Sequence, residues 1–326
     1  MTTRGQTHTH RRNICPPGLP RGLPSITIES ETPGPKAAVC ANLHGDECVG
    51  IGVIHDLAST LPDQLLRGSV RLYPTLNPEG LRAGARRAPG DRKDLNRAFP
   101  GDARGSAVER TAHAVWTDIR SFGPELVLDL HADSSASIPY TILDRLVVPG
   151  PDKPRRLATL LAFAKATGLT VVHDYKEAPY RRFGLDRSLS GALLNHGRLS
   201  AITLELGPRR LVHPDAARAG VQAVLGALTE LGLVGRSATA HSSRVAGGPW
   251  RRDSGPSVRC AGILRPLHAP GTVLRSGQDL ATVHSVDGEL LERLSAPTRA
   301  LILSLAERTW ISPGESVATL AVPDEG

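Results

Sequence analysis

Four polar positions along the chain carry side chains that could hold a metal ion and move protons. His44 and Glu47 follow one apolar run, His131 ends a second, and Glu205 follows a third. Two histidines and one carboxylate, with a position left for water, describe a catalytic zinc site rather than a closed structural one. Glu205 then supplies a spare carboxylate, which can take a proton from an activated water molecule and return it to a leaving group.

A second group of residues is suited to binding an anion. Asn96 and Arg97 lie in the stretch Asp94-Leu-Asn-Arg97, and a planar guanidinium can grip a carboxylate through two charge-assisted hydrogen bonds. Arg97 and Glu205 could each have a purely structural role instead. Arg97 could form an ion pair with Asp94, and Glu205 could pair with a nearby arginine such as Arg209.

Short apolar or β-branched runs alternate with segments of helical periodicity. We predict strands near residues 25–28, 36–41, 69–73, 125–130, 170–173 and 201–206. Helical periodicity follows Glu47, starts again at Ser106, and recurs over 157–164 and 214–231. Such alternation predicts an α/β fold with a mixed sheet covered by helices. The metal-binding candidates lie at or just past strand carboxyl ends, where open α/β sheets bind ligands.

The texture of the chain changes near residue 235, which predicts a division into parts. We expect a flexible, polar N-terminal tail over 1–23 and a catalytic α/β domain over 24–235. A Gly/Ser/Arg/Pro-rich linker is expected over 236–257, followed by a small all-β domain over 258–326 with Gly-containing turns. The chain has 326 residues, a length that accommodates a main domain plus a smaller one.

Composition restricts the partners and the compartment. The net charge is +7, but aromatic residues make up only 3%, which argues against single-stranded nucleic-acid binding through base stacking. The sequence contains no apolar run long enough to span a membrane and no secretory signal, so we expect a cytoplasmic protein. The four cysteines show no CxxC spacing, which fits reduced thiols. The positive charge is instead consistent with attraction of small anionic substrates.

The motifs together resemble the succinylglutamate desuccinylase/aspartoacylase family, which is grouped with the zinc carboxypeptidases. The resemblance extends from about residue 37 to 208 and weakly beyond. The stretches that carry it are His44-Gly-Asp-Glu47, Asn77-Pro78, Asp94-Leu-Asn-Arg-Ala-Phe-Pro100, Asp129-Leu-His131 and Glu205-Leu-Gly-Pro208.

The resemblance implies a role for each of these positions. His44, Glu47 and His131 would bind one Zn²⁺ per chain, with Asp129 behind them. Asn96 and Arg97 would hold the substrate carboxylate, and Glu205 would be the general base. Relatives also use an arginine upstream of the DLNR stretch to polarise the scissile carbonyl. The candidates here are Arg86, Arg87 and Arg92, of which Arg87 fits the spacing best.

The sequence departs from the family at its C-terminal end. Aspartoacylase-like enzymes use a tyrosine from this part, but no tyrosine follows Ser200. Tyr175 and Tyr180 are candidate substitutes. The C-terminal unit resembles a lipoyl-type β domain but contains no lysine, so it cannot carry a cofactor through one. Shielding of the active-site mouth or self-association as a homo-oligomer remain as its roles.

The resemblance and the residues predict a zinc-dependent deacylase that cleaves the amide of a small, anionic N-acyl amino acid. The alternative is a metallocarboxypeptidase or murein-peptide amidase that acts on short peptides with the same site. A non-enzymatic binding module is disfavoured, because every catalytic position has an intact candidate residue.

Overall fold

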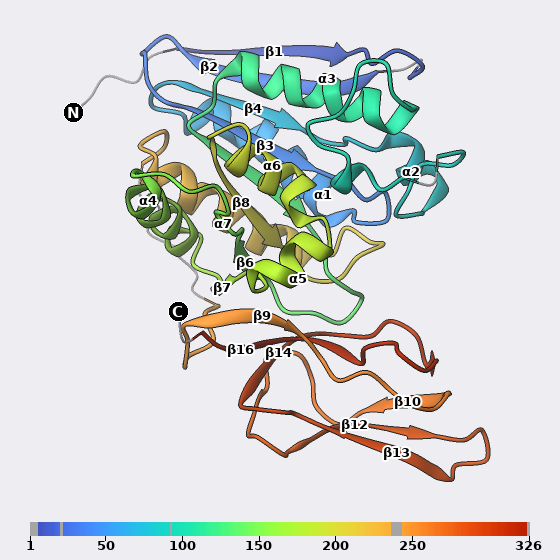
Figure 1. Ribbon diagram of the computed structural model, residues 1–326. Coiled ribbons are helices and arrows are strands. Elements are labelled where there is room, and N and C mark those ends of the chain that lie inside the picture. Colours follow the sequence, from blue (N-terminus) through green and yellow to red (C-terminus); the bar gives the residue numbers. More distant parts are fainter. Residues whose placement is uncertain (1–5, 20–21, 92, 236–242, 325–326) are drawn as a thin grey trace.

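The computed structural model describes residues 6–19, 22–91, 93–235 and 243–324. Within these residues a twelve-stranded mixed sheet runs through the molecule, and a four-stranded sheet lies at its C-terminal end (Figure 1). The large sheet has the strand order β1-β2-β4-β3-β5-β8-β6-β7-β9-β16-β14-β11, and the small one the order β13-β12-β10-β15.

The elements divide into a first part rich in helices and a second part made of strands. The strands of the first part are β1 (Thr7–Ile14), β2 (Leu23–Ser30), β3 (Lys36–Ala41), β4 (Ser69–Tyr73), β5 (Leu126–His131), β6 (Tyr140–Leu143), β7 (Thr170–His173) and β8 (Ser200–Glu205). Its α-helices are α1 (Val49–Thr60), α2 (Pro78–Ala83), α3 (Ala107–Phe122), α4 (Lys153–Ala166), α5 (Glu177–Arg182), α6 (Leu189–Asn195) and α7 (Pro214–Glu230). The second part consists of β9 (Trp250–Ser254), β10 (Gly262–Pro266), β11 (Val273–Leu274), β12 (Asp279–His284), β13 (Leu290–Ser295), β14 (Ala300–Leu305), β15 (Trp310–Ile311) and β16 (Ala318–Pro323).

Helices cover both faces of the central strands. Alternate residues of β3 point to opposite faces, so Val39 packs in one core cluster and Cys40 in the other. The first cluster contains the apolar stripes of α1, α4 and α7, and the second contains those of α3 and α6. This arrangement confirms the predicted fold class, a mixed sheet between helices with a β part at the C-terminus.

Part of the segment 1–23, which we predicted to be a flexible tail, is a strand. Thr7–Ile14 is strand β1, which pairs antiparallel with β2 along its whole length. The sequence pattern concealed it because most of its side chains are exposed, and backbone hydrogen bonds rather than apolar burial hold it. Arg12 adds an ion pair with Asp118 of α3.

The segment predicted as a linker contains a strand. Residues 236–242 lie outside the described part, but β9 pairs parallel with β7 and antiparallel with β16. The large sheet therefore continues from the catalytic part into the C-terminal part. One sheet thus passes through both predicted units. The division at residues 235 and 258 stays a prediction.

Within the described part of the chain, no helix is both long and apolar enough to cross a membrane.

Candidate metal centre and active site

The loop between β3 and α1 carries the first two metal-ligand candidates. Asn42 organises it from a left-handed backbone conformation, φ 57°, with its Nδ2 donating to the carbonyl oxygens of His44, Gly45 and Glu47 at 2.9–3.1 Å. Gly45 is required by close packing, since a Cβ there would lie 2.0 Å from the carbonyl carbon of Gly80. The loop therefore presents His44 and Glu47 on one side, just before α1 begins.

The other two candidates come from neighbouring parallel strands. His131 ends β5 and Glu205 ends β8, and the two residues are register partners. Because β3, β5 and β8 are adjacent, all four side chains meet at the carboxyl edge of the sheet.

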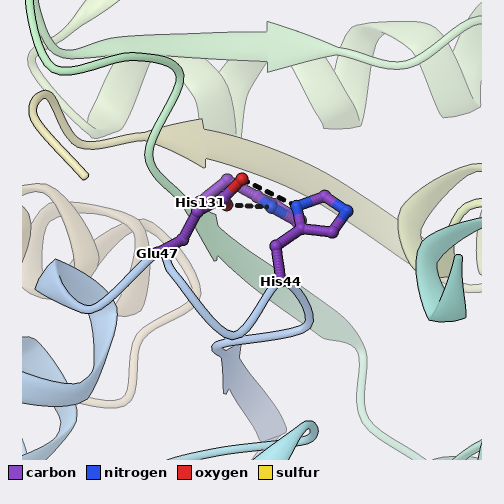
Figure 2. Close-up of side chains that lie close together, drawn as sticks. All are labelled: His44, Glu47 and His131. Carbon is purple, nitrogen blue, oxygen red and sulfur yellow. Dashed lines mark hydrogen bonds and ion pairs between the residues drawn. The ribbon is translucent and has the colours of Figure 1, made fainter. Parts of the chain in front are cut away.

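His44, Glu47 and His131 form one buried cluster (Figure 2). One ligand atom from each lies within 4.8 Å of the others. Glu47 stands between the imidazoles, with Oε1 2.7 Å from His44 Nδ1 and Oε2 2.8 Å from His131 Nδ1. Two imidazoles and a carboxylate facing one another are a donor set that fits zinc with further coordination positions left open.

Each imidazole has a carboxylate behind it. His44 Nε2 lies 3.3 Å from Asp94 Oδ1, and His131 Nε2 lies 3.1 Å from Asp129 Oδ2. Such outer carboxylates orient histidine ligands so that the opposite nitrogen faces the metal. Asp129 was predicted for this place. Asp94 was considered only as a partner of Arg97, so its contact with His44 was missed.

The close contacts in the cluster shift the pKa values of Glu47 and His131 in opposite directions. Burial opposes ionisation of Glu47, but His44 and His131 outweigh it and hold the pKa of this carboxyl well below its usual value. Burial likewise opposes the charged form of His131, whereas Asp129 and Glu47 raise its pKa well above the usual value. Glu47 is therefore held in the ionised form that a metal-ligand carboxylate requires.

The DLNR stretch lies beside the cluster. Arg97 does not pair with Asp94, because its Nε donates to the Phe183 carbonyl at 2.7 Å and its Nη1 to the Asn96 carbonyl at 2.6 Å. Asn96 is buried, accepts from the Leu189 N–H at 2.7 Å, and lies 3.3 Å from His131 Nε2 through its Nδ2. Arg97 lines the cavity, and no carboxylate of the described residues is hydrogen-bonded to it.

Of the arginines upstream of this stretch, Arg86 lines the cavity, with its Nη2 2.9 Å from Asp94 Oδ2 and its Nη1 3.7 Å from Glu47 Oε1. Arg87 is exposed and does not line the cavity, so the structure brings Arg86 and not the predicted Arg87 to the site, while the choice of the polarising arginine stays a prediction. The physical reason is that Gly45 N and Asn77 Nδ2 both donate to the Arg86 carbonyl and fix this residue against the site. Arg92 lies outside the described residues.

Glu205 faces the cavity and is 8% exposed. Among the described residues it forms no ion pair, and its Oε2 has no hydrogen-bond partner. Arg209 is engaged elsewhere, with Asp46 at 3.4 Å and Glu307 at 3.3 Å. Burial, and then the negative charge of Asp133, raises the pKa of Glu205 to about 8. The structural alternative for Glu205, a pair with Arg209, is therefore absent from this part of the molecule.

The far wall of the cavity was not predicted from the sequence. It contains two buried carboxylates, Asp144 after β6 and Asp174 after β7, and the guanidinium of Arg252 from β9. Arg252 lies 3.9 Å from Asp174 Oδ1, whereas Asp144 has no ion pair within the described residues. Burial, and then Asp174, raises the pKa of Asp144 to about 7.

The two tyrosines considered as substitutes lie around this wall. The ring of Tyr175 lies 5.1 Å from the Arg252 guanidinium carbon, and the buried Tyr180 hydroxyl donates to Asp144 at 3.3 Å. Neither lines the cavity, which has a volume of about 110 Å³. The side chain that the C-terminal part contributes is thus an arginine. It could have been found only by pairing residues 250–254 with β7.

Comparison with known proteins agrees with this architecture. The mixed sheet covered by helices is a metallocarboxypeptidase-like fold. Residues 33–231 match the model of the succinylglutamate desuccinylase/aspartoacylase catalytic domain. The chain is also 30% identical over 271 residues to an N-alpha-acetyl-L-2,4-diaminobutyric acid deacetylase from Halomonas elongata, a match that covers 80% of this chain and 74% of the relative. The chain belongs to the succinylglutamate desuccinylase/aspartoacylase family.

Solved structures share this fold, two of them over nearly the whole chain and one over 71% of it. A succinylglutamate desuccinylase/aspartoacylase from Rhodobacter sphaeroides has a TM-score of 0.81 at 22% identity, covering 100% of this chain and 98% of that one. The product-bound ectoine utilization protein EutE (DoeB) from Ruegeria pomeroyi has a TM-score of 0.80 at 20% identity, covering 99% and 97%. A metallo-carboxypeptidase from Burkholderia cenocepacia has a TM-score of 0.53 at 19% identity, covering 71% and 66%.

Proposed function

We propose that this protein is a zinc-dependent deacylase that hydrolyses the amide bond of an N-acylated amino acid. The observation that carries the proposal is a single cavity lined by His44, Glu47 and His131 together with Glu205 and Arg97. Membership of a deacylase family supports the reaction class. We propose one Zn²⁺ per chain, held by the two histidines and Glu47.

The bound zinc would supply a Lewis acid for the amide carbonyl and lower the pKa of a water molecule. The outer carboxylates, Asp94 and Asp129, keep the imidazoles turned toward Glu47. Arg86, held by Asp94, adds positive charge at the rim, where it can stabilise the negative oxygen that forms in the transition state.

Glu205 is the proposed proton carrier. Its free Oε2 can take a proton from the attacking water and then deliver it to the leaving amine. Arg97 is the proposed anchor of the substrate carboxylate, because it lines the cavity and, within the part of the chain that the structure describes, donates to backbone carbonyls alone. Asn96 lies between Arg97 and His131, and we propose that it helps to orient both the carboxylate and the imidazole.

The cavity favours a small substrate that carries one negatively and one positively charged group. Arg97 suits a carboxylate, while Asp144, buried and with no ion pair to any described residue, suits an ammonium group. The relative from Halomonas elongata is named for an acetylated diamino acid, which has both groups. We therefore propose an N-acetylated diamino acid as the substrate class. The alternative, a carboxypeptidase or murein-peptide amidase, requires room for a peptide, and the small cavity argues against it.

A panel of amides assayed with zinc-loaded enzyme tests the proposal. The panel comprises N-acetyl-L-2,4-diaminobutyrate, N-acetyl-aspartate, N-succinyl-glutamate and a dipeptide. We expect fastest hydrolysis of the first compound, loss of activity on chelation and recovery with zinc. Full activity in metal-free protein would contradict the zinc assignment, and preference for the dipeptide would favour the alternative.

We also propose the cytoplasm as the compartment. Its support is that Cys15, Cys40, Cys48 and Cys260 are all free thiols, as expected under reducing conditions.

A further inference from the structure

We propose that Arg252, supplied by the C-terminal β part, is a second guanidinium ligand for the substrate carboxylate and acts beside Arg97. The inference rests on the proposed function, since it assumes that a carboxylate-bearing substrate enters the cavity. It gives the C-terminal part a direct place in substrate recognition.

The pairing of β9 determines where Arg252 lies. Trp250 and Arg251 are register partners of Val172 and His173 in the parallel strand β7. Arg252 therefore falls level with Asp174, the first residue beyond β7, at the edge where the other site residues lie. On its other side Arg252 is the register partner of Ala321 in β16, so its backbone is held between two strands.

Among the described residues Arg252 makes no hydrogen bond to a carboxylate, although Asp174 and Asp133 lie near enough to stabilise its charge. Its side chain is 18% exposed, and the nearest carboxylate oxygen, Asp174 Oδ1, lies 3.9 Å from Nη1, which is beyond hydrogen-bond distance. Its Nε is buried with no hydrogen-bond partner among the described residues. A buried guanidinium N–H without an acceptor is unfavourable unless a ligand supplies one. Since Arg252 lines the cavity, a bound carboxylate is suited to this role.

Arg97 and Arg252 act on the same space. Both line the cavity, and Asp174 interacts electrostatically with both. Burial lowers the pKa of Arg97, and the positive charges of Arg86 and Arg252 lower it further although Asp94 opposes them. The two guanidinium groups thus lie close enough to affect each other and share the neighbouring carboxylate of Asp174. A substrate carboxylate bound by both would relieve this repulsion.

The adjacent arginine provides a matched control. Arg251 precedes Arg252 on the same strand, but its Nε lies 3.3 Å from Asp324 Oδ1 and it does not line this cavity. Replacement of either arginine by glutamine removes the same charge from the same strand. Only the change at position 252 should affect an anion in the cavity.

The test is calorimetric titration of the full-length, zinc-loaded protein with L-2,4-diaminobutyrate and with its carboxamide, which lacks the carboxylate. We expect Arg252→Gln to weaken binding of the acid by about tenfold to about 100-fold, the effect of losing hydrogen bonds to a charged group. Binding of the carboxamide should change little, and Arg251→Gln should bind both compounds like the wild type. Thermal unfolding and zinc content are measured in parallel.

Three results would overturn the inference: equal weakening of acid and carboxamide, no change for the acid in Arg252→Gln, or failure of the wild type to bind the acid. If Arg252→Gln does not fold, Arg252→Lys decides. It keeps the charge but not the two-pronged geometry, so it should lose affinity for the acid alone. A wild type that binds the acid through Arg252 but hydrolyses no acyl compound would refute the proposed function and leave this inference standing.

Discussion

His131 and Glu205 are register partners at the carboxyl ends of the adjacent parallel strands β5 and β8. This pairing places a metal-ligand candidate beside a carboxylate whose Oε2 has no hydrogen-bond partner among the described residues, although 73 residues lie between them in the chain. Residues opposite each other on neighbouring strands point to the same face of a sheet. The proposed division of labour, in which His131 binds zinc and Glu205 moves protons, depends on this relationship.

Replacement of Glu205 by glutamine tests that division. We expect Glu205→Gln to retain zinc and to lower kcat by about 100-fold to about 10,000-fold, the usual contribution of a general acid–base group. Metal analysis and steady-state kinetics measure the two effects. Glu230→Gln, at the exposed end of α7, is a control that should match the wild type. Unimpaired turnover in Glu205→Gln would remove this residue from the mechanism.

Arg86 and Arg87 form a second matched pair. We expect Arg86→Ala to reduce kcat by about 100-fold, comparable to the loss of one oxyanion-stabilising donor. Arg87→Ala should have little effect, because this side chain is exposed and outside the cavity. Kinetics of both variants on one N-acetyl amino acid provide the comparison. A larger loss in Arg87→Ala would show that the loop after α2 rearranges when substrate binds.

Asp144, in the far wall of the cavity, predicts a pH dependence of substrate binding. Burial, and then Asp174, raises the pKa of Asp144 to about 7, so this carboxyl is mostly neutral below that pH and charged above it. The KM for N-acetyl-L-2,4-diaminobutyrate should therefore fall as pH rises through about 7. An N-acetyl amino acid with a neutral side chain should not show this change.

The control for this prediction is Asp144→Asn. This change removes the titrating group but keeps the size of the side chain, so the fall in KM with rising pH should disappear. The KM for the diamino acid should rise by about tenfold, as expected for a lost hydrogen bond to a charged group. KM is measured across the pH range for both substrates. The same pH profile in wild type and Asp144→Asn would rule out Asp144 as the origin.

Sequence reasoning predicted the central part of the fold well, because its signals are local. The apolar run 36–41 is strand β3, and the run 69–73 is β4. Since ligands bind at the carboxyl ends of strands, the sequence alone predicts that His44, Glu47 and His131 lie close together, as they do in the structure.

The features that were missed depend on distant pairing. Strand β1 is polar on both faces and is held by its partner β2. Arg252 lies in a Gly/Ser/Arg-rich stretch that resembles a linker, and only the pairing of β9 with β7 brings it to the site. The choice between Arg86 and Arg87 depends on which carbonyl the His44 loop binds, which no local pattern records.

The proposed deacylase function depends most directly on zinc bound by His44, Glu47 and His131. Diffraction from a crystal of the zinc-loaded protein, measured at the zinc absorption edge, tests this binding site. We predict one anomalous peak per chain, about 2.0–2.2 Å from a nitrogen of each histidine and from Glu47, with Glu205 near but not bound. A peak elsewhere, or none between these three side chains, would contradict the central claim.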